Sequence, residues 1–313
     1  MNEFVKSPMN YTGNKHRLLL HINKHFDKNI NTFVDLFSGG GSVGLNSGAK
    51  NVYFIDKNQR VIDLLEFLYK ADFQELLGSI FKIIEKFKLS CTYKKGYEYY
   101  RERKRIRDNN GYKEFNVKGF KKLKEYYNGL EDKKTKNAIS HLYVLMLYSF
   151  NNDIRFNSQG EFNLPCGKTD FNKANYEKLK FFVNSKPGRK FYFICGDFRE
   201  AKIKKIIMKS DVVYADPPYI ITNAFYNENN GWNSKDEEDL LNLLLTRVEK
   251  NKFTLLSNIT EKTGHKNKIL INWINNNPSL FFENIDYHYK SSSYNKINRN
   301  SNEKEVLVFG GEY

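Results

Sequence analysis

The sequence has few cysteines and no long apolar segment. Its three cysteines, Cys91, Cys166 and Cys195, lie far apart, with neither a CxxC pair nor a Cys/His cluster around them. This spacing argues against a disulfide framework and a zinc site, so we expect chemistry without a protein-bound metal. No uninterrupted apolar run could span a bilayer, and residues 1–6 lack the apolar core of a signal peptide. We therefore expect a cytoplasmic protein that does not bind a membrane.

Acidic residues are scarce relative to basic ones. The 313 residues include 36 Asp and Glu against 51 Lys and Arg, which gives a formal net charge of +15. A charge of this size attracts a nucleic acid backbone, whose counterions are released when Lys and Arg approach. A membrane surface is the competing partner, but the sequence has no amphipathic basic terminus. The length allows one α/β core and a second, smaller unit, and no internal repeat is present.

A strand, a glycine-rich turn, a helix and a second strand follow one another near the N-terminus. The strands are expected at residues 32–37 and 51–55, the turn at 38–42, and the helix from Val43. Glycines let the backbone approach a ligand, and Asp56, about 20 positions further on, can hydrogen-bond ribose hydroxyls. This pattern predicts a cofactor site. A flexible surface turn is one alternative and a nicotinamide enzyme another, although the GxGxxG spacing of the latter is not met.

The tetrapeptide Asp216-Pro217-Pro218-Tyr219 follows the strand-like run 211–215. Its two prolines fix φ and lack N–H groups, which leaves carbonyl groups available as acceptors. The Asp216 carboxylate and the Pro217 carbonyl can each accept one hydrogen of an exocyclic amine, while Tyr219 offers a flat face on which a base can stack. The alternative is an ordinary strand-to-loop turn with a solvated aspartate.

Basic and aromatic residues are mixed between residues 71 and 189, as in 93–101 and 118–124. Such mixtures suit a surface that neutralises phosphates, and ordinary solvated helices are the alternative. Residues 138–148 are apolar almost all round and predict a buried helix, which leads into a polar loop at 149–163. A rigid helix that carries a loop of Asn, Arg and Gln is suited to presenting base-reading side chains. A long loop without a function is the alternative, and such loops are uncommon in compact domains.

Strand patterns return after residue 189. They lie at 190–195, 211–215 and 252–258, with a helix expected at 240–248. Two further runs, 281–289 and 305–310, predict a hairpin that closes the sheet.

Four segments in one order resemble the Dam-like (D12 class) adenine-specific, S-adenosylmethionine-dependent DNA methyltransferases. The segment NYTGNK at 10–15 is similar to the family's N-terminal cofactor segment, and DLFSGGGS at 35–42 to its glycine motif. Residues 155–167 are similar to the segment after its base-reading loop, and the tetrapeptide at 216–219 to its catalytic motif. The resemblance covers nearly the whole chain.

This resemblance implies an α/β fold, a Rossmann-like methyltransferase domain with a mostly parallel sheet and a closing C-terminal hairpin. A mainly helical DNA-recognition domain is inserted into it. Residues 1–70 and 190–313 would form the S-adenosylmethionine-dependent catalytic domain, and 71–189 the target-recognition domain. The implied activity is transfer of a methyl group from S-adenosyl-L-methionine to adenine N6 in double-stranded DNA by base flipping, with a cognate restriction endonuclease as a further partner. An RNA adenine N6-methyltransferase, the same chemistry on a protein glutamine, and a DNA-binding module that has lost catalysis are the alternatives.

The resemblance also assigns site residues. The implied catalytic residues are Asp216, Pro217, Pro218 and Tyr219. The implied cofactor-binding residues are Tyr11, Lys15, Asp35, Phe37, Gly39, Gly41, Asp56, Asp197, Phe198 and Asp216, with Asp35 and Gly39 near the methionine end and Asp197 and Phe198 flanking the adenine. The candidate DNA-binding residues are Asn10, Asn151, Asn152, Arg155 and Asn157.

Arginine pairs best with guanine and asparagine with adenine in the major groove, which favours Arg155 and Asn151 for base contacts. A phosphate contact or an internal salt bridge is the alternative for Arg155. The chain departs from the family at Asn14, where a glycine is usual, and this change is expected to alter how the loop packs. It also departs at 152–154, where GATC-specific relatives usually carry small or apolar residues, so the target sequence stays open.

Overall fold

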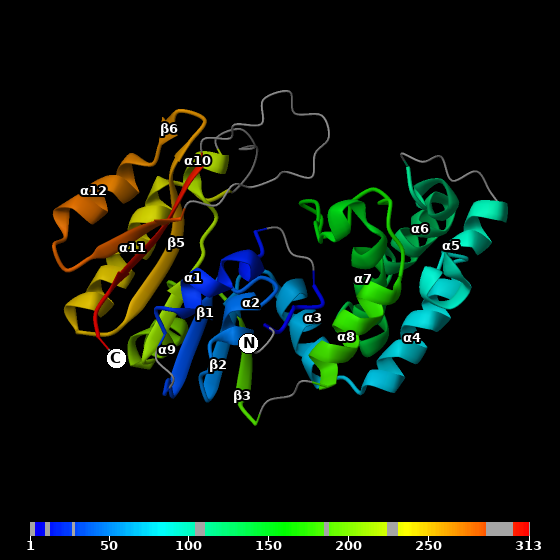
Figure 1. Ribbon diagram of the computed structural model, residues 1–313, viewed down its shortest axis with the longest axis horizontal. Coiled ribbons are helices and arrows are strands. Elements are labelled where there is room, and N and C mark those ends of the chain that lie inside the picture. Colours follow the sequence, from blue (N-terminus) through cyan, green and yellow to red (C-terminus); the bar gives the residue numbers. More distant parts are fainter. Residues whose placement is uncertain are drawn as a thin grey trace. The chain divides into compact units, whose positions relative to one another are not determined.

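The computed structural model describes residues 4–9, 13–26, 29–103, 110–184, 188–223, 231–285 and 303–312. The chain forms two compact units (Figure 1). One is mainly helical and comprises Met1–Arg17, Gly39–Leu45 and Asn58–Gly188. The other is built around a sheet and comprises Leu18–Ser38, Asn46–Lys57 and Arg189–Tyr313.

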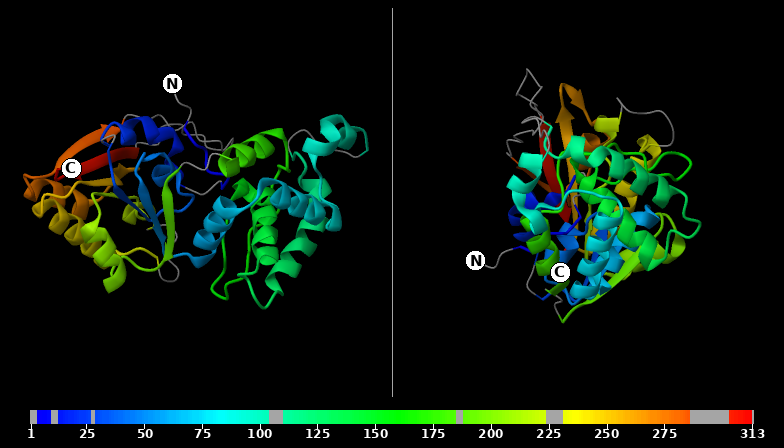
Figure 2. Two further views of the ribbon diagram at one scale, coloured as in Figure 1. Left: turned by 90° about the horizontal axis from the view of Figure 1, so that it is seen from below. Right: turned by 90° about the vertical axis from the view of Figure 1, so that its right-hand side faces the viewer.

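The second unit contains a mixed, mostly parallel sheet (Figures 1 and 2). Its strand order is β3-β2-β1-β4-β5-β8-β7. The first five strands in this order are parallel, whereas β8 runs antiparallel to both of its neighbours. The order reverses direction between β1 and β4, which makes this gap the topological switch point, where α/β sheets bind ligands. The strands are β1 (Thr32–Leu36), β2 (Asn51–Asp56), β3 (Lys190–Cys195), β4 (Val212–Ala215), β5 (Thr254–Lys262), β6 (His265–Lys266), β7 (Phe281–Ile285) and β8 (Glu303–Gly310).

Central parallel strands are buried on both faces and should therefore be apolar throughout. In β4 all four residues are buried, and in β1 four of the five are, including Asp35 at 2 % exposure. Apolar residues of α9, α11 and α12 pack with these strands in one core cluster, which includes Ile203, Leu244 and Leu270. The helices of this unit are α1 (Leu19–Asn23), α9 (Ala201–Lys209), α10 (Ile220–Asn223), α11 (Ser234–Glu249) and α12 (Lys268–Asn276).

The C-terminal hairpin predicted from the sequence is confirmed, because β7 and β8 pair in antiparallel register from Phe281↔Phe309 to Ile285↔Glu305. The strand order adds a detail that the pattern did not give: β8 inserts between β5 and β7. The rest of the run expected as a strand, 286–289, and the connection at 290–302 lie outside the described residues.

The helical unit is organised around α7, which is buried at eleven consecutive positions, Ala138–Tyr148, as expected. It packs against α3, α4 and α6. Gly96, with φ 73° and ψ 167°, interrupts α5, because these dihedral angles are not helical. The helices are α3 (Gln59–Lys70), α4 (Phe73–Lys86), α5 (Thr92–Arg103), α6 (Lys113–Asn128), α7 (Lys136–Tyr148), η2 (Phe150–Asn152) and α8 (Lys173–Asn184), with the short η1 (Lys15–Leu18) and α2 (Ser42–Asn46) near the N-terminus.

Candidate active site and DNA-binding loop

The carboxyl ends of four parallel strands bring most of the predicted residues of the sheet unit to one edge. Leu36 of β1 is paired with Ile55 of β2 and with Ala215 of β4, and Asp56 is paired with Cys195 of β3. The residues that immediately follow these positions therefore start from the same edge of the sheet. They are Phe37, Asp197, Phe198 and the tetrapeptide Asp216–Tyr219.

The tetrapeptide begins directly after β4 and is anchored at the switch point. The backbone N–H of Asp216 donates to the carbonyl oxygen of Leu36 at 3.3 Å, which ties it to the end of β1. The hydroxyl of Tyr219 donates to Oδ1 of Asp216 at 3.0 Å. Pro217 is buried and Pro218 is exposed. Burial, followed by the nearby charge of Asp216, raises the pKa of Tyr219 well above its usual range, so this hydroxyl stays a hydrogen-bond donor.

Phe37 occupies a left-handed backbone conformation, with φ 64°. A bulky residue is rarely found there, and such strain is concentrated at functional sites. Its ring packs edge-on against Trp232, with a centroid distance of 5.4 Å, and against Phe198 at 5.9 Å. The hydroxyl of the next residue, Ser38, is buried and has no hydrogen-bond partner within the part of the chain that the structure describes. A polar ligand group beside the turn would satisfy it, which fits a bound cofactor.

Asp197 and Phe198 are held by Arg199. The guanidinium of Arg199 pairs with Asp197 (3.2 Å) and with two carboxylates of α11, Asp239 (2.9 Å) and Asp236. It also lies 4.5 Å from the ring centroid of Phe198. The conformation of the predicted adenine-flanking pair therefore depends on the first turns of α11.

Three further predicted cofactor residues belong to the helical unit. The Nζ of Lys15 donates to the carbonyl oxygen of Gly13 (3.0 Å) and its side chain is buried. Gly39 and Gly41 have φ of 48° and 72°, a region that favours glycine.

Asn14, where the sequence departs from the family, accepts hydrogen bonds through Oδ1 from the Ser42 hydroxyl and the His16 N–H, both at 2.8 Å. The departure at this position thus supplies loop contacts. Tyr11 and Asn10 lie outside the described residues.

The polar loop after α7 is a two-armed hairpin. Phe156 and Phe162 form an antiparallel bridge, and Ser149 bridges Cys166 nearer its base. The side chain of Asn128, at the end of α6, donates to the Phe162 carbonyl oxygen (3.1 Å) and accepts from the Phe162 N–H (2.9 Å). These contacts fix the hairpin to the helical unit.

The predicted DNA-binding residues of this hairpin divide into two groups. Asn151 and Arg155 are exposed, and the Nε of Arg155 donates to Oδ1 of Asn163 at 2.9 Å. Asn152 and Asn157 instead use their side-chain amides within the protein, Asn152 on the Leu147 carbonyl oxygen and the Thr169 hydroxyl, and Asn157 on Glu161. In this conformation they shape the loop.

Several residues of these sites were missed by the sequence analysis. Phe150, the first residue of η2, is 51 % exposed and is followed by two asparagines with positive φ, Asn151 and Asn152. An aromatic residue beside an Asn-Asn pair is a local signal that could have found it. Trp232 and Arg199 left no such signal, because the contacts that join them to the rest of the site, Trp232 with Phe37 and Arg199 with Asp236 and Asp239, link residues remote in sequence.

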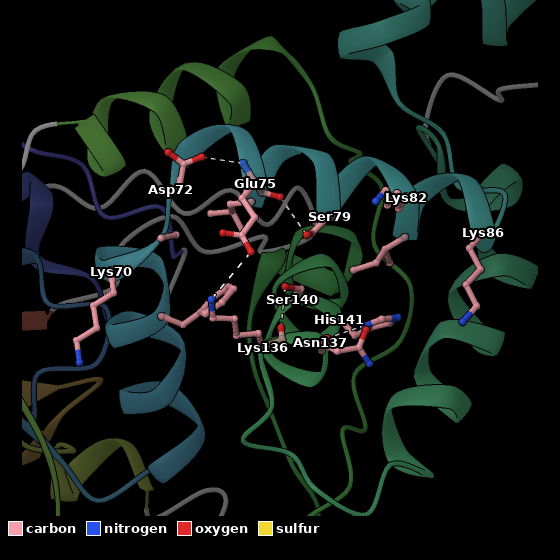
Figure 3. A pocket seen from close by; sticks show the side chains of 14 residues that line it. Lys70, Asp72, Glu75, Ser79, Lys82, Lys86, Lys136, Asn137, Ser140 and His141 are labelled. Atoms are coloured by element: carbon pink, nitrogen blue, oxygen red, sulfur yellow. Dashed lines mark hydrogen bonds and ion pairs between the residues drawn. The ribbon is translucent and has the colours of Figure 1, made fainter.

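A separate cavity of about 480 Å³ lies in the helical unit between α4 and α7 (Figure 3). His141 forms part of its wall and donates from Nδ1 to the Asn137 carbonyl oxygen at 2.7 Å. Burial lowers the pKa of His141, so its ring is neutral at pH 7. None of the predicted site residues that the structure describes lines this cavity. Its charged rim carries Lys70, Asp72, Glu75, Lys82, Lys86 and Lys136.

Within the described residues, no group of three or more His, Cys, Asp and Glu side chains is arranged to hold a metal ion. No helix in the same ranges is long and apolar enough to cross a membrane.

The strand order and the anchored tetrapeptide define an α/β protein with a candidate ligand site at its switch point. The family of D12 class N6 adenine-specific DNA methyltransferases matches residues 11–303, and the chain belongs to this family. The family resemblance noted in the sequence is thereby confirmed. A methyltransferase family implies S-adenosylmethionine as donor, and the description of this family names DNA as the substrate of its members.

Three relatives illustrate the similarity. Type II methyltransferase M.FokI of Planomicrobium okeanokoites is 33% identical over 313 residues, which covers 98% of this chain and 43% of that protein. Modification methylase StsI of Streptococcus sanguinis is 32% identical over 312 residues, with the same coverage of 98% and 43%. DNA adenine methylase of Escherichia coli (strain K12) is 24% identical over 254 residues, covering 80% and 79%. The chain spans less than half the length of the first two relatives.

Proposed function

We propose that this chain transfers a methyl group from S-adenosylmethionine to N6 of an adenine in duplex DNA. The observation that carries the proposal is the anchoring of Asp216 to the end of β1 at the switch point, with Tyr219 bonded to its carboxylate. Family membership supports the same chemistry. The names of the relatives, a type II methyltransferase and a modification methylase, support a role beside a cognate restriction endonuclease.

The residues of the sheet edge fit the donor. Phe37 and Phe198 offer aromatic rings to its purine, Asp56 and Asp197 offer carboxylates to its ribose and exocyclic amine, and Ser38 offers a buried hydroxyl. When bound there, the donor supplies an electrophilic methyl group. Lys15, Gly39 and Gly41 stay predictions from the resemblance.

The target adenine must leave the duplex, because its N6 cannot reach the donor while it is stacked. Unstacking costs a few kcal/mol, which the DNA-binding energy offsets. Tyr219 stacks on the extruded base, while the Asp216 carboxylate and the Pro217 carbonyl accept the two hydrogens of N6. These bonds favour a pyramidal amine whose lone pair is less delocalised into the ring. Catalysis therefore rests on positioning and electrostatics, and the N6 proton leaves to water after transfer.

The helical unit supports target recognition. We assign this role to residues 71–189, with Asn151 and Arg155 on the hairpin as base contacts and Phe150 as an exposed aromatic neighbour. Residues 1–70 and 190–313 then form the catalytic domain. The target sequence is not assigned.

The test uses Asp216→Ala and the unchanged protein with unmethylated duplex DNA and labelled donor. We expect N6-methyladenine in the products of the unchanged protein. For the variant we expect a rate at least about 100-fold lower, because the carboxylate that accepts a hydrogen bond from N6 is lost, while DNA and donor binding stay measurable. Near-normal turnover of Asp216→Ala, or methyl transfer to RNA in preference to DNA, would overturn the proposal.

A further inference from the structure

Glu237, on the first turn of α11, has a fully buried carboxylate, and within the described residues its three hydrogen-bond donors are all neutral. The side chain is 0 % exposed. The indole N–H of Trp232 donates to it at 2.6 Å, the amide of Asn258 at 2.9 Å and the amide of Asn267 at 3.1 Å. Burying a carboxylate without a cation costs desolvation free energy that neutral donors offset only in part. A role beyond packing would account for its presence.

The donors come from three elements and converge on one carboxylate. Trp232 precedes α11, Asn258 lies in the middle of β5, and Asn267 is the N-cap of α12. A fully satisfied buried network of this kind is rigid. The Trp232 indole is therefore held in one orientation by its N–H, while its ring remains available for other contacts.

The ring of Trp232 contacts the predicted cofactor residues. Its centroid lies 5.4 Å from that of Phe37 and 6.1 Å from that of Phe198, and those two rings are 5.9 Å apart. Phe37 is also the residue whose backbone is strained, with φ 64°. Strained conformations persist where their surroundings over-determine them, and Trp232 supplies such a constraint.

We propose that Glu237 is a positioning residue of the cofactor site. It fixes Trp232, and through Trp232 it holds Phe37 and Phe198 in the arrangement that receives the purine ring of the donor. This inference rests on the proposed function, since it takes the Phe37 and Phe198 rings as the donor's purine site. Glu237 itself does not touch the reacting atoms.

Glu237→Gln is the first test. The amide has nearly the shape of the acid but turns an N–H₂ group toward donors, so at least one of the three hydrogen bonds is lost. Binding of S-adenosylhomocysteine is read from the fluorescence of Trp232 in a Trp273→Phe background, because the chain has two tryptophans. We expect a roughly tenfold larger dissociation constant and a shifted Trp232 emission maximum. The kcat at saturating donor and the KM for DNA should stay within about twofold.

Glu238→Gln is the matched control, because Glu238 is exposed on the same turn and should leave donor binding unchanged. Trp232→Phe is the second variant, since it keeps an aromatic ring and removes the indole N–H together with the five-membered ring that carries it. Calorimetric titration should show that this variant weakens binding of S-adenosylhomocysteine by a similar factor. The double variant Glu237→Gln/Trp232→Phe should bind S-adenosylhomocysteine as tightly as the single variant with the lower affinity, because both changes break the same contact. Should Glu237→Gln not fold, Trp232→Phe against the unchanged protein decides the question.

Two failures are distinguishable. If the unchanged protein binds the donor product and methylates DNA while Glu237→Gln, or Trp232→Phe in its place, binds equally well, this inference is wrong and the proposed function stands. Additive effects in the double variant would also overturn it. If the unchanged protein neither binds S-adenosylhomocysteine nor methylates DNA, the proposed function itself is wrong.

Discussion

The hydroxyl of Tyr219 donates a hydrogen bond of 3.0 Å to Oδ1 of Asp216, so two candidate catalytic side chains are joined where β4 ends. This bond orients both the carboxylate and the ring. It also persists over the pH range of any ordinary assay, because burial and the Asp216 charge raise the pKa of Tyr219 well above its usual range. The two proposed functions of Tyr219, stacking on the base and orienting the Asp216 carboxylate, can be separated by mutation.

Tyr219→Phe keeps the ring and removes the hydroxyl. We expect the rate of methyl transfer in a single turnover to fall by about tenfold, because one orienting hydrogen bond is lost. Tyr219→Ala should cost about tenfold more, since stacking on a base contributes roughly 1–3 kcal/mol. Equal rates for the Phe and Ala variants would contradict the stacking role. Retained binding of S-adenosylhomocysteine in both variants is the control for folding.

Residues whose partners are close in sequence were the predictable part of the site. The tetrapeptide follows β4 and the glycine turn follows β1, and in both cases an apolar strand is followed by residues that cannot continue it. Such local patterns can be recognised in a sequence. The start of α11 at residue 234, six residues earlier than expected, was also readable, because Asn233 and Asp236 form a capping box.

Contacts between remote residues could not be read in this way. Glu237 meets Asn258 and Asn267 across 21 and 30 residues. Asn128 meets Phe162 across 34 residues, and on its own it is an ordinary asparagine near the end of a lysine-rich helix. Their roles depend on how strands and helices pack. The position of β8 between β5 and β7 belongs to the same class, since a hairpin pattern gives the pairing but not the neighbour on the other side.

Arg155 is predicted to read a base. Its Nε is engaged with Asn163, which steadies the guanidinium, and a bidentate contact to guanine needs two N–H donors that the terminal nitrogens can supply. Arg155→Ala should relax discrimination at one base pair of the target by about 1–3 kcal/mol. Methylation rates on a panel of singly substituted duplexes measure this. If the variant instead loses DNA affinity equally for all duplexes, and its DNA affinity depends less steeply on salt concentration, Arg155 contacts a phosphate.

Asn128 is predicted to act on DNA binding through the hairpin. Asn128→Ala removes both hydrogen bonds to the Phe162 backbone and leaves two backbone groups to find other partners. We expect the DNA dissociation constant to rise by about tenfold, because the hairpin of the variant must be ordered when DNA binds and this ordering costs free energy. Donor binding should be unchanged. A variant with normal DNA affinity would show that the hairpin keeps its conformation without Asn128.

Lys178 predicts a pH dependence of stability. Burial, followed by the positive charge of Lys6, lowers its pKa from 10.5 to about 8. Between these values the folded chain has lost the proton while the unfolded chain retains it, so stability rises with pH through this window. Below about pH 8 both states are protonated and the cost of burying the charge is complete.

Lys178→Met should therefore raise the free energy of unfolding at pH 7 and flatten its rise between pH 8 and 10. The expected gain is roughly 1–2 kcal/mol, less than the full shift because the side chain is partly exposed. Urea titrations at several pH values measure it. Lys173→Met, an exposed position on the same helix, is the control. If both variants show the pH slope of the unchanged protein, Lys178 is not the titrating group.

Arg199 joins the predicted adenine-flanking pair to α11 through three carboxylates, and only a planar guanidinium can meet all three from one position. Arg199→Ala leaves Asp197, Asp236 and Asp239 to repel one another, so we expect Asp197 to lose its conformation and the dissociation constant of S-adenosylhomocysteine to rise about tenfold or more. Arg199→Lys keeps the positive charge but lacks the several fixed N–H donors of a guanidinium. Compared with Arg199→Ala, it should recover only part of the affinity for S-adenosylhomocysteine. Calorimetric titration measures both.

Lys202→Ala, which removes an exposed ion pair with Glu200 on the same segment, should have no effect. Full recovery by lysine would show that charge alone, without the three-way geometry, holds Asp197 in place.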